Sequence, residues 1–351
     1  MKKEFSINNF VRENVKGLKP YSSARDEYIS DGSKMVFLDA NENPYENGVN
    51  RYPDPQQRGL KAVLAAQKGV EPQHILLGNG SDEVLDLLFR AFCEPKEDNV
   101  ISLPPTYGMY KVLSAINNIE NREVLLTPDF QPDVDAILQQ VDIHTKMIFL
   151  CSPNNPTGNS FSSDIIKELL ECFQGLVVID EAYIDFSSDT SWTTRLAEYP
   201  NLIVTQTLSK AYGMAGIRLG ICVASSEIIN VVNKIKPPYN VNELTQQKAF
   251  ERVKALDLVE KEVGDILAGK KELLKVLKEI SFIEKVYASD ANFVLAKVDN
   301  ADTRYQELLS KGIVVRNRTT QPLCENTLRF TIGTKEENEQ LIAVLRMLSK
   351  E

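Results

Sequence analysis

The sequence predicts an α/β protein with a largely parallel sheet, followed by a smaller α+β domain. In the middle of the chain, short runs of β-branched residues alternate with helical patterns, which indicates a sheet covered by helices. After Pro237-Pro238 the composition changes, and residues 242–280 are rich in Lys, Glu, Leu and Ala, as long helices are. A chain of 351 residues is long enough to fold into one large and one smaller domain.

The first expected strand ends in a glycine turn that leads into a helix. Residues 74–77 form the apolar run, and Gly78-Asn79-Gly80 follows it. Apolar residues then recur at helical spacing over residues 84–92, and Ser81 stands where an N-cap is expected. Five further strands are expected at residues 100–103, 146–151, 176–179, 202–206 and 219–224.

The C-terminal part of the chain mixes strands and helices in the order of a small α+β domain. We expect a strand at residues 292–298, a helix at 303–311, and strands at 313–316 and 327–332. A last helix begins near Thr334, where Thr334 and Glu337 fit a capping box. The turn-rich start of the chain is expected to form an arm. The expected division is an arm at 1–48, a large domain at 49–250 and a small domain at 251–351.

Charge and composition limit the classes of function. The net charge is −9, which argues against a general binder of nucleic acid or of anionic membranes. No apolar run reaches the roughly eighteen residues that span a bilayer, and residues 1–4 lead into polar sequence without a signal core. Five widely spaced cysteines indicate reduced thiols in a cytoplasmic protein. With two histidines, neither a histidine-rich metal site nor a Ser-His-Asp hydrolase is expected.

Polar side chains follow the strands of the predicted sheet, at the edge where ligands of such sheets bind. The strand at 146–151 runs into Ser152-Pro153-Asn154-Asn155-Pro156-Thr157-Gly158, and the strand at 176–179 ends on Asp180-Glu181-Ala182-Tyr183. The strand at 202–206 ends on Thr207-Leu208-Ser209-Lys210, while the glycine turn delivers a helix N-terminus at Ser81-Asp82. An amide, a carboxylate, a phenol, an amine and an anion-binding helix end are therefore expected to converge.

This set of groups matches the requirements of pyridoxal 5′-phosphate. The cofactor needs an amine for its Schiff base, a carboxylate that keeps the pyridine nitrogen protonated, and an anchor for its phosphate. Lys210 supplies the amine, provided that its pKa is depressed, and Asp180 supplies the carboxylate. Backbone amides at the start of the Ser81 helix suit the phosphate, with help from Ser209 and Arg218.

Taken alone, each feature has an ordinary structural explanation. A Ser-Lys pair means little among 40 basic residues, and Asn-Pro-Thr-Gly is a good turn sequence. Asp180-Glu181 is also compatible with an exposed acidic turn. Independent turns and surface charges have no reason to fall at successive strand ends in this order, so the combination favours the functional interpretation.

The chain resembles the fold-type I aminotransferases in four motifs that occur in the right order. Residues 207–220, with Lys210 among them, resemble the lysine signature of that family, and residues 152–158 resemble its asparagine loop. Asp180 precedes the lysine at the distance that the family shows. The resemblance implies a large domain with a mostly parallel seven-stranded sheet and a smaller α+β domain.

Within that family, further motifs resemble histidinol-phosphate aminotransferases from about residue 10 to the C-terminus. They lie at residues 12–15, 20–25, 38–44, 50–54, 105–110 and 328–334. The resemblance implies ping-pong transfer of an amino group from glutamate to imidazole-acetol phosphate, which gives histidinol phosphate and 2-oxoglutarate in histidine biosynthesis.

Two related activities and one unrelated function stay open. Aromatic amino acid aminotransferases and threonine-phosphate decarboxylases share much of this motif set, and the substrate pocket alone distinguishes them. A non-catalytic module that binds the cofactor, such as half of a transcription regulator, would need a DNA-binding domain. The segment before Tyr52 is short and has no helix-turn-helix pattern, which argues against that function.

The resemblance also implies roles for individual residues at the cofactor. Lys210 would hold the cofactor and move the proton, and Asp180 would bind the pyridine nitrogen. Asn155 and Tyr183 would hydrogen-bond the 3′-oxygen, and Tyr107 would stack on the ring. The phosphate would be held by Ser209, Arg218 and the backbone at Ser81 and Asp82.

Roles outside the cofactor ring follow in the same way. Tyr52 would reach the phosphate from the neighbouring subunit, which implies a homodimer whose contact includes the arm. Arg329 would bind a substrate anion, either the carboxylate of glutamate or the phosphate of histidinol phosphate, because a planar guanidinium binds both. Arg316, Tyr21 and Asn43 are further candidates for the substrate pocket.

Overall fold

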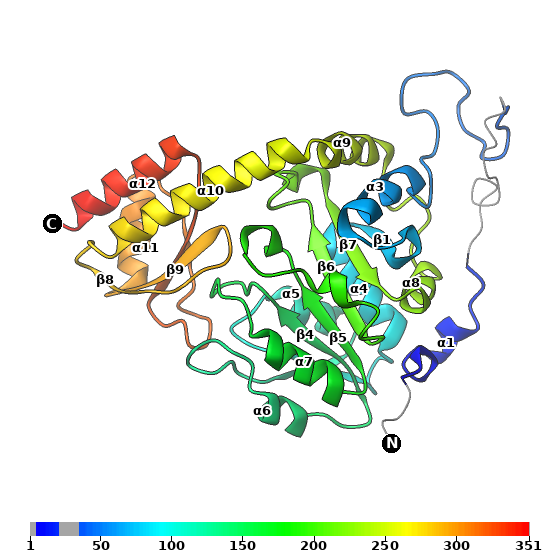
Figure 1. Ribbon diagram of the computed structural model, residues 1–351, viewed down its shortest axis with the longest axis horizontal. Helices are drawn as coiled ribbons and strands as arrows, with labels where there is room; N and C mark the ends of the chain where they lie inside the picture. The colour runs from blue at the N-terminus through cyan, green and yellow to red at the C-terminus, as the bar shows by residue number, and fades with distance from the viewer. Residues whose placement is uncertain (1–4, 21–34, 351) are drawn as a thin grey trace.

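The computed structural model describes residues 5–20 and 35–350 and contains two sheets (Figure 1). The strands of the larger sheet are β1 (Ile75–Asn79), β2 (Asn99–Ser102), β3 (Glu120–Glu123), β4 (Thr145–Cys151), β5 (Leu176–Asp180), β6 (Leu202–Thr207) and β7 (Leu219–Ala224). The smaller sheet contains β8 (Ile283–Val286), β9 (Phe293–Val298), β10 (Arg316–Asn317) and β11 (Thr327–Thr331). The α-helices are α1 (Glu13–Lys16), α3 (Arg58–Lys68), α4 (Gly80–Phe92), α5 (Met109–Ile116), α6 (Val134–Gln139), α7 (Ser163–Cys172), α8 (Ser226–Asn233), α9 (Glu243–Lys254), α10 (Leu256–Leu277), α11 (Ala301–Ser310) and α12 (Lys335–Leu348).

The larger sheet confirms the predicted fold class. Its seven strands follow the order β1-β7-β6-β5-β4-β2-β3, and β7 alone runs antiparallel to its neighbours. The central strands β4 to β7 are almost completely buried, which explains their continuous apolar sequences. Strand β3 was not predicted, because Glu120-Asn121-Arg122-Glu123 is a polar strand at the edge of the sheet.

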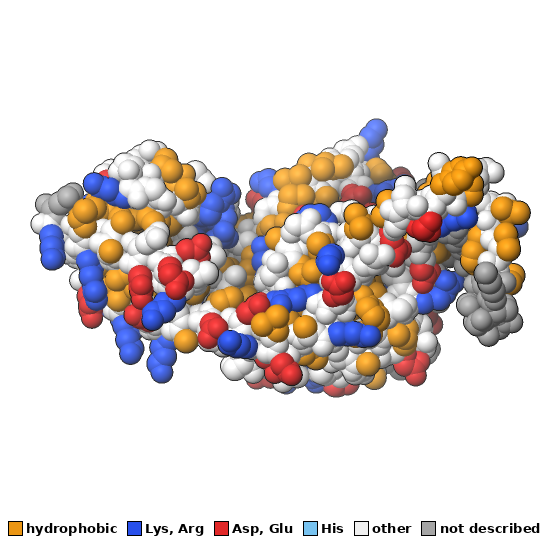
Figure 2. All heavy atoms as spheres, turned by 90° about the horizontal axis from the view of Figure 1, so that it is seen from above, with side chains coloured by type: hydrophobic (Ala, Val, Ile, Leu, Met, Phe, Trp, Pro, Cys, Tyr) orange, Lys and Arg blue, Asp and Glu red, His pale blue; other side chains and the backbone are white. Residues whose placement is uncertain are grey.

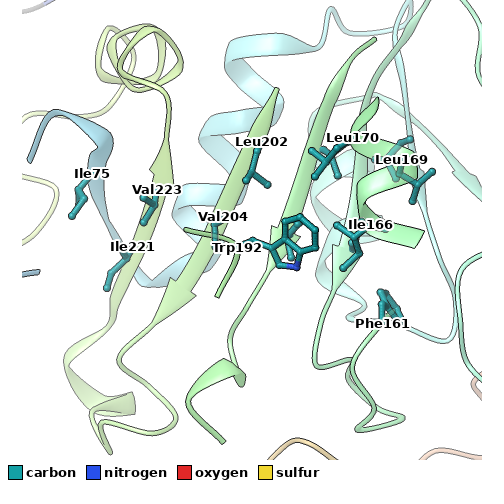
Figure 3. Close-up of a cluster of buried hydrophobic side chains, with 14 of the residues drawn as sticks. Ile75, Phe161, Ile166, Leu169, Leu170, Trp192, Leu202, Val204, Ile221 and Val223 are labelled. Carbon is teal, nitrogen blue, oxygen red and sulfur yellow. The ribbon is translucent and has the colours of Figure 1, made fainter. Parts of the chain in front are cut away.

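One face of the larger sheet packs on α7 and on a loop that carries the single tryptophan (Figure 3). Leu202 and Val204 of β6 and Leu170 of α7 belong to one buried cluster. Trp192 is 8% exposed and belongs to the same cluster, and its backbone N–H donates to Glu181 Oε1 at 2.7 Å. Trp192 is therefore a core residue that packs on this face of the sheet and is linked to Glu181 at the end of β5.

The start of α4 differs from the prediction. Helix α4 begins at Gly80, so Ser81 lies in its first turn, and the predicted N-cap at Ser81 is wrong. Gly80 has φ +76°, and a Cβ there would lie 2.6 Å from Arg218 Nη2. A Cβ on Gly220 would lie 2.2 Å from the backbone nitrogen of Ser81. Both glycines are thus required for β7 and Arg218 to approach the helix end.

The smaller sheet is antiparallel in the order β10-β11-β9-β8, and the long helix α10 packs on it (Figure 1). The predicted capping box is confirmed, since Thr334 accepts from the Glu337 N–H and Glu337 accepts from the Thr334 N–H. The strand expected at 313–316 is shifted to Arg316–Asn317, and β8 was missed. The domain boundary expected at residue 250 lies inside α9 and stays a prediction.

The N-terminal segment lies at one end of the molecule, where Figure 1 shows it as an extended blue ribbon. Val36, Leu38 and Tyr45 are each at least 80% exposed. Figure 2 shows hydrophobic atoms gathered at this end, whereas basic and acidic side chains are mixed over the remaining visible surface. Among the helices of residues 5–20 and 35–350, none combines the length and the apolar character needed to cross a membrane.

Candidate active site

A cavity of about 310 Å³ lies at the ends of β5 and β6 and is closed on one side by β10 and β11. It brings together most of the predicted site residues, namely Ser81, Asp82, Tyr107, Asn155, Asp180, Tyr183, Ser209, Lys210, Arg218, Arg316 and Arg329. These residues come from α4, from the ends of β4, β5 and β6, from the segments before α5 and β7, and from the smaller sheet. The convergence expected from the sequence is therefore present in the structure.

Lys210 lies in the turn that follows β6. Thr207 fixes this turn, because its hydroxyl donates to Ser209 Oγ at 3.0 Å and accepts from the Ser209 N–H at 3.1 Å. The Lys210 ammonium lies 5.7 Å from the centre of the Tyr183 ring. Burial and the nearby Arg329 guanidinium lower the pKa of Lys210. A larger neutral fraction makes this amine a better nucleophile and proton carrier.

Asp180 is the last residue of β5 and is 3% exposed. Tyr110 Oη donates to Asp180 Oδ2 at 2.9 Å, and the Ala182 N–H donates to Oδ1 at 3.2 Å. Burial raises the pKa of Asp180 to about 6 despite these hydrogen bonds. Because both partners are neutral, a cation placed beside Asp180 would stabilise its ionised form, and a protonated pyridine nitrogen is such a cation.

Glu181, the next residue, points away from the cavity and is 1% exposed. Its carboxylate accepts from Ser191 Oγ at 2.6 Å, from the Trp192 N–H at 2.7 Å and from Gln206 Nε2 at 2.8 Å. Asp180-Glu181 is therefore not an exposed acidic turn. The Asp180 carboxylate faces the cavity, and the Glu181 carboxylate links the end of β5 to Gln206 of β6 and to the segment at Ser191 and Trp192.

Asn155 and Tyr183 lie side by side, as expected for two groups that bind one oxygen. Asn155 Nδ2 is 3.4 Å from Tyr183 Oη, and Arg329 Nη1 donates to Asn155 Oδ1 at 2.5 Å. Burial raises the pKa of Tyr183, so its phenol stays protonated at neutral pH and can donate a hydrogen bond. The Arg329 contact fixes the orientation of the Asn155 amide.

The start of α4 lies at the cavity, which Ser81, Asp82 and Arg218 line. Its N-cap residue Asn79 makes no side-chain cap, so amides of the first turn keep their donors for a ligand. Asp82 Oδ2 is 3.7 Å from Arg218 Nη2, and Tyr107 Oη donates to Asp82 Oδ1 at 2.9 Å. These contacts place Arg218 and Tyr107 at the helix end. The amine, the buried carboxylate and this anion site together fit pyridoxal phosphate.

Two of the predicted residues, Tyr52 and Asn43, do not line this cavity. The Tyr52 ring is half exposed and stacks on Tyr239, with ring centres 4.5 Å apart. The Asn43 side chain accepts from the Tyr45 N–H at 2.9 Å and does not line the cavity. Tyr21 lies outside the described residues. The roles of all three stay predictions.

Two residues with a place at the site were missed by the sequence analysis. Tyr110 lies in the motif at 105–110, in the first turn of α5 and three residues after Tyr107, and the two rings meet edge to face. Arg318 lies two residues after Arg316, and alternation along a strand would have placed both on one face. Arg318 lines the cavity together with Arg316 and Arg329.

Tyr110→Phe is expected to leave the fold intact and to lower kcat by up to about tenfold, because one buried hydrogen bond to Asp180 is lost. The same variant should shift the acidic limb of the pH–rate profile upward, since the phenol stabilises the ionised carboxylate. Steady-state rates between pH 5 and 9 measure both effects. Tyr305→Phe on α11 is the control, and an unchanged profile in Tyr110→Phe would contradict this role.

Cofactor-free protein should lose stability as the pH rises through the pKa of Asp180. The folded state binds this proton more tightly than the unfolded state, whose pKa is near 3.8. Protonated Asp180 stabilises the folded state fully below about pH 4, and this stabilisation is lost above about pH 6. The free energy of unfolding changes by roughly 3 kcal/mol between these limits. Urea unfolding at several pH values measures it. Asp180→Asn should remove this part of the pH dependence, and an identical slope in both proteins would refute it.

Comparison with known proteins agrees with this site. The family model for aminotransferase class I and II matches residues 31–345. The chain therefore belongs to the class I and II aminotransferases. It is 68% identical over 346 residues to the histidinol-phosphate aminotransferase of Flavobacterium johnsoniae, which covers 98% of this chain and 99% of the relative. Within the class, the chain belongs to the histidinol-phosphate aminotransferase family.

Solved structures share the fold. The histidinol-phosphate aminotransferase of Clostridium acetobutylicum matches with a TM-score of 0.80 at 24% identity, over 86% of this chain and 91% of that one. The Sinorhizobium meliloti enzyme, solved in complex with pyridoxal-5′-phosphate, matches with a TM-score of 0.77 at 22% identity, over 85% and 83% of the two chains. At these identities the likeness establishes the fold-type I architecture that the sequence predicted.

Proposed function

We propose that this chain binds pyridoxal phosphate and transfers an amino group between histidinol phosphate and 2-oxoglutarate, as a step of histidine biosynthesis. The observation that carries the proposal is the convergence of Lys210, Asp180, Asn155 and Tyr183 in a cavity that arginines also line. The name of the Flavobacterium johnsoniae relative, at 68% identity over nearly the full length, supports the choice of substrate.

Four side chains perform the chemistry at the centre of the cavity. The bound cofactor withdraws electrons from the substrate Cα and carries the amino group between two half-reactions. Lys210 holds the cofactor between turnovers, and its amine, with its lowered pKa, moves the proton at the substrate Cα. Asp180 keeps the ring nitrogen protonated, while Asn155 and Tyr183 bind the ring oxygen from one side.

The substrate anion binds at the wall of the cavity that β10 and β11 form. Arg329 is held by Asn155 and lies over the Phe293 ring at 4.9 Å, so its guanidinium is fixed in one orientation. Both substrates carry an anion that such a group binds, a carboxylate in glutamate and a phosphate in histidinol phosphate. One pocket can therefore serve both half-reactions.

We further propose that the protein acts in the cytoplasm as a homodimer in which Tyr52 completes the partner's phosphate site. Tyr52 does not line the cavity of its own chain, and the neighbouring arm exposes Val36 and Leu38 almost fully. Apolar side chains exposed in this way favour coverage by another protein surface. A second copy of the chain that packs on this arm would bury Val36 and Leu38. It would also bring Tyr52 to the phosphate site of that second copy.

Tyr52→Phe is expected to weaken cofactor binding about tenfold, because one hydrogen bond to the phosphate is lost. Mixed dimers of Tyr52→Phe and Lys210→Ala subunits distinguish the two arrangements. If Tyr52 acts across the interface, half of the sites formed in each mixed dimer regain both residues and bind cofactor with wild-type affinity. Weak binding at every site of the mixed dimers would place Tyr52 within its own subunit.

The substrate is tested by steady-state turnover of the loaded enzyme with 2-oxoglutarate and one amino donor at a time. Histidinol phosphate is expected to give glutamate with a kcat/KM far above that of phenylalanine, tyrosine or threonine phosphate. Preference for phenylalanine or tyrosine would move the chain to the aromatic aminotransferases. Release of carbon dioxide from threonine phosphate would make it a decarboxylase.

A further inference from the structure

Arg318 is a third guanidinium in the substrate wall of the cavity. It follows β10, and its backbone N–H donates to the Thr327 carbonyl of β11 at 2.9 Å, so its position is fixed by the smaller sheet. Arg316 pairs with Arg329 across β10 and β11. Alternation along the chain places Arg316 and Arg318 on the same face, and all three arginines line the cavity.

These three guanidinium groups have no counter-charge in the part of the chain that the structure describes. There, none of them lies within ion-pair distance of a carboxylate, and the one side-chain hydrogen bond among them joins Arg329 to the neutral Asn155. Arg318 Nε and Arg329 Nε are both buried without a hydrogen-bond partner. Because buried donors are normally satisfied, these two atoms point to a ligand that supplies acceptors.

The electrostatics at Arg318 favours the binding of an anion. Burial, followed by the charges of Arg329 and Arg316, lowers the pKa of Arg318 to about 10. The cavity as a whole is lined by five basic and two acidic side chains. One basic group, Arg218, lies at the start of α4 beside Asp82, where the cofactor phosphate would bind. The excess positive charge therefore remains at the wall formed by β10 and β11.

We propose that Arg318 is a specificity-determining residue that binds the distal phosphate of the substrate and gives the site its preference for a phosphate monoester over a carboxylate. The inference rests on the proposed function and deepens it. A carboxylate has two oxygens and one charge, which a single guanidinium such as Arg329 satisfies in a bidentate contact. A phosphate monoester has three terminal oxygens and up to two charges, so it can engage three guanidinium groups.

The test compares two substrates of the same enzyme. In Arg318→Gln, kcat/KM for histidinol phosphate should fall about ten- to a hundredfold, while that for glutamate should fall less than about threefold. Arg318→Lys keeps a charge and should recover part of the loss. Arg346→Gln on α12, which is half exposed, is the control and should change neither value. A structural defect would lower kcat/KM for both substrates by the same factor. Equal losses of kcat/KM for the two substrates, or no loss for either, would therefore overturn the proposal.

A binding measurement keeps the two proposals separate. Isothermal titration of the cofactor-loaded enzyme with inorganic phosphate should give a dissociation constant about tenfold weaker in Arg318→Gln than in the wild type or Arg346→Gln. If the wild-type enzyme does not turn over histidinol phosphate, the proposed function fails, and this titration still decides the role of Arg318. Equal phosphate affinity in all three proteins would exclude Arg318 from anion binding.

Discussion

Lys210→Ala is expected to lower transamination by a factor on the order of 10⁴ or more, because one amine both holds the cofactor and moves the proton. The variant should also lack the yellow colour of a lysine-bound cofactor. Steady-state turnover and the visible spectrum measure the two effects independently. Lys335→Ala on α12, where the side chain is exposed, is the matched control and should retain both activity and colour.

The structure gives a physical reason for the size of this effect. The Lys210 amine projects into the cavity beside Tyr183, and burial lowers its pKa. The other basic groups that line the cavity are all guanidinium groups, those of Arg218, Arg316, Arg318 and Arg329. A guanidinium can neither form the covalent link nor exchange a proton at neutral pH. A Lys210→Ala variant that keeps its spectrum would mean that another group binds the cofactor.

Asp180→Asn should lower kcat by about 10³-fold while the cofactor stays bound, because the amide keeps the shape of the side chain but not its charge. A neutral partner cannot hold the ring nitrogen protonated, so the electron-withdrawing power of the cofactor is lost. Phosphate contacts at α4 and the Lys210 link do not depend on this charge. Rapid-mixing rates and the cofactor content of the purified variant measure the two properties.

The matched control for this substitution is Asp189→Asn in an exposed loop, which should behave as the wild type. A rate loss of less than about tenfold in Asp180→Asn would show that the carboxylate charge contributes little to the transition state. Loss of the cofactor from the variant would show instead that Asp180 serves mainly to bind it.

The sequence predicted the larger sheet well because its central strands are buried on both faces. Continuous apolar runs at β4 to β7 favour buried strands. The polar groups of the site follow the ends of β4, β5 and β6 and directly precede β7. The two polar edge strands β3 and β8 were missed because they lack such a run. Residues 120–123 and 283–286 are exposed and polar enough to resemble loops.

The start of α4 could not be predicted from local capping rules. Ser81 is a good N-cap residue, yet the helix begins one residue earlier because Gly80 and Gly220 let β7 and Arg218 approach it. This contact joins segments far apart in the sequence, so no local pattern encodes it. The same packing leaves the first turn of α4 without a side-chain cap, so its amides are not taken up by a capping side chain.

The two missed site residues illustrate a similar limit. Tyr110 acts through Asp180, and Arg318 acts beside Arg316 and Arg329, so their places depend on side chains that meet only in the folded chain. Motif positions predicted the groups that are proposed to contact the cofactor, and most of these groups line the cavity. The groups that orient them, and that balance the charge of the cavity, required the structure.

The central claim is tested most directly by a half-reaction of the purified, cofactor-loaded enzyme. Histidinol phosphate is added without an acceptor, and the visible absorption of the lysine-bound cofactor is followed by rapid mixing. The account predicts fast loss of this absorption with histidinol phosphate, no comparable loss with phenylalanine or threonine phosphate, and full recovery on addition of 2-oxoglutarate. An absorption that histidinol phosphate leaves unchanged, in a protein that retains its cofactor, would contradict it.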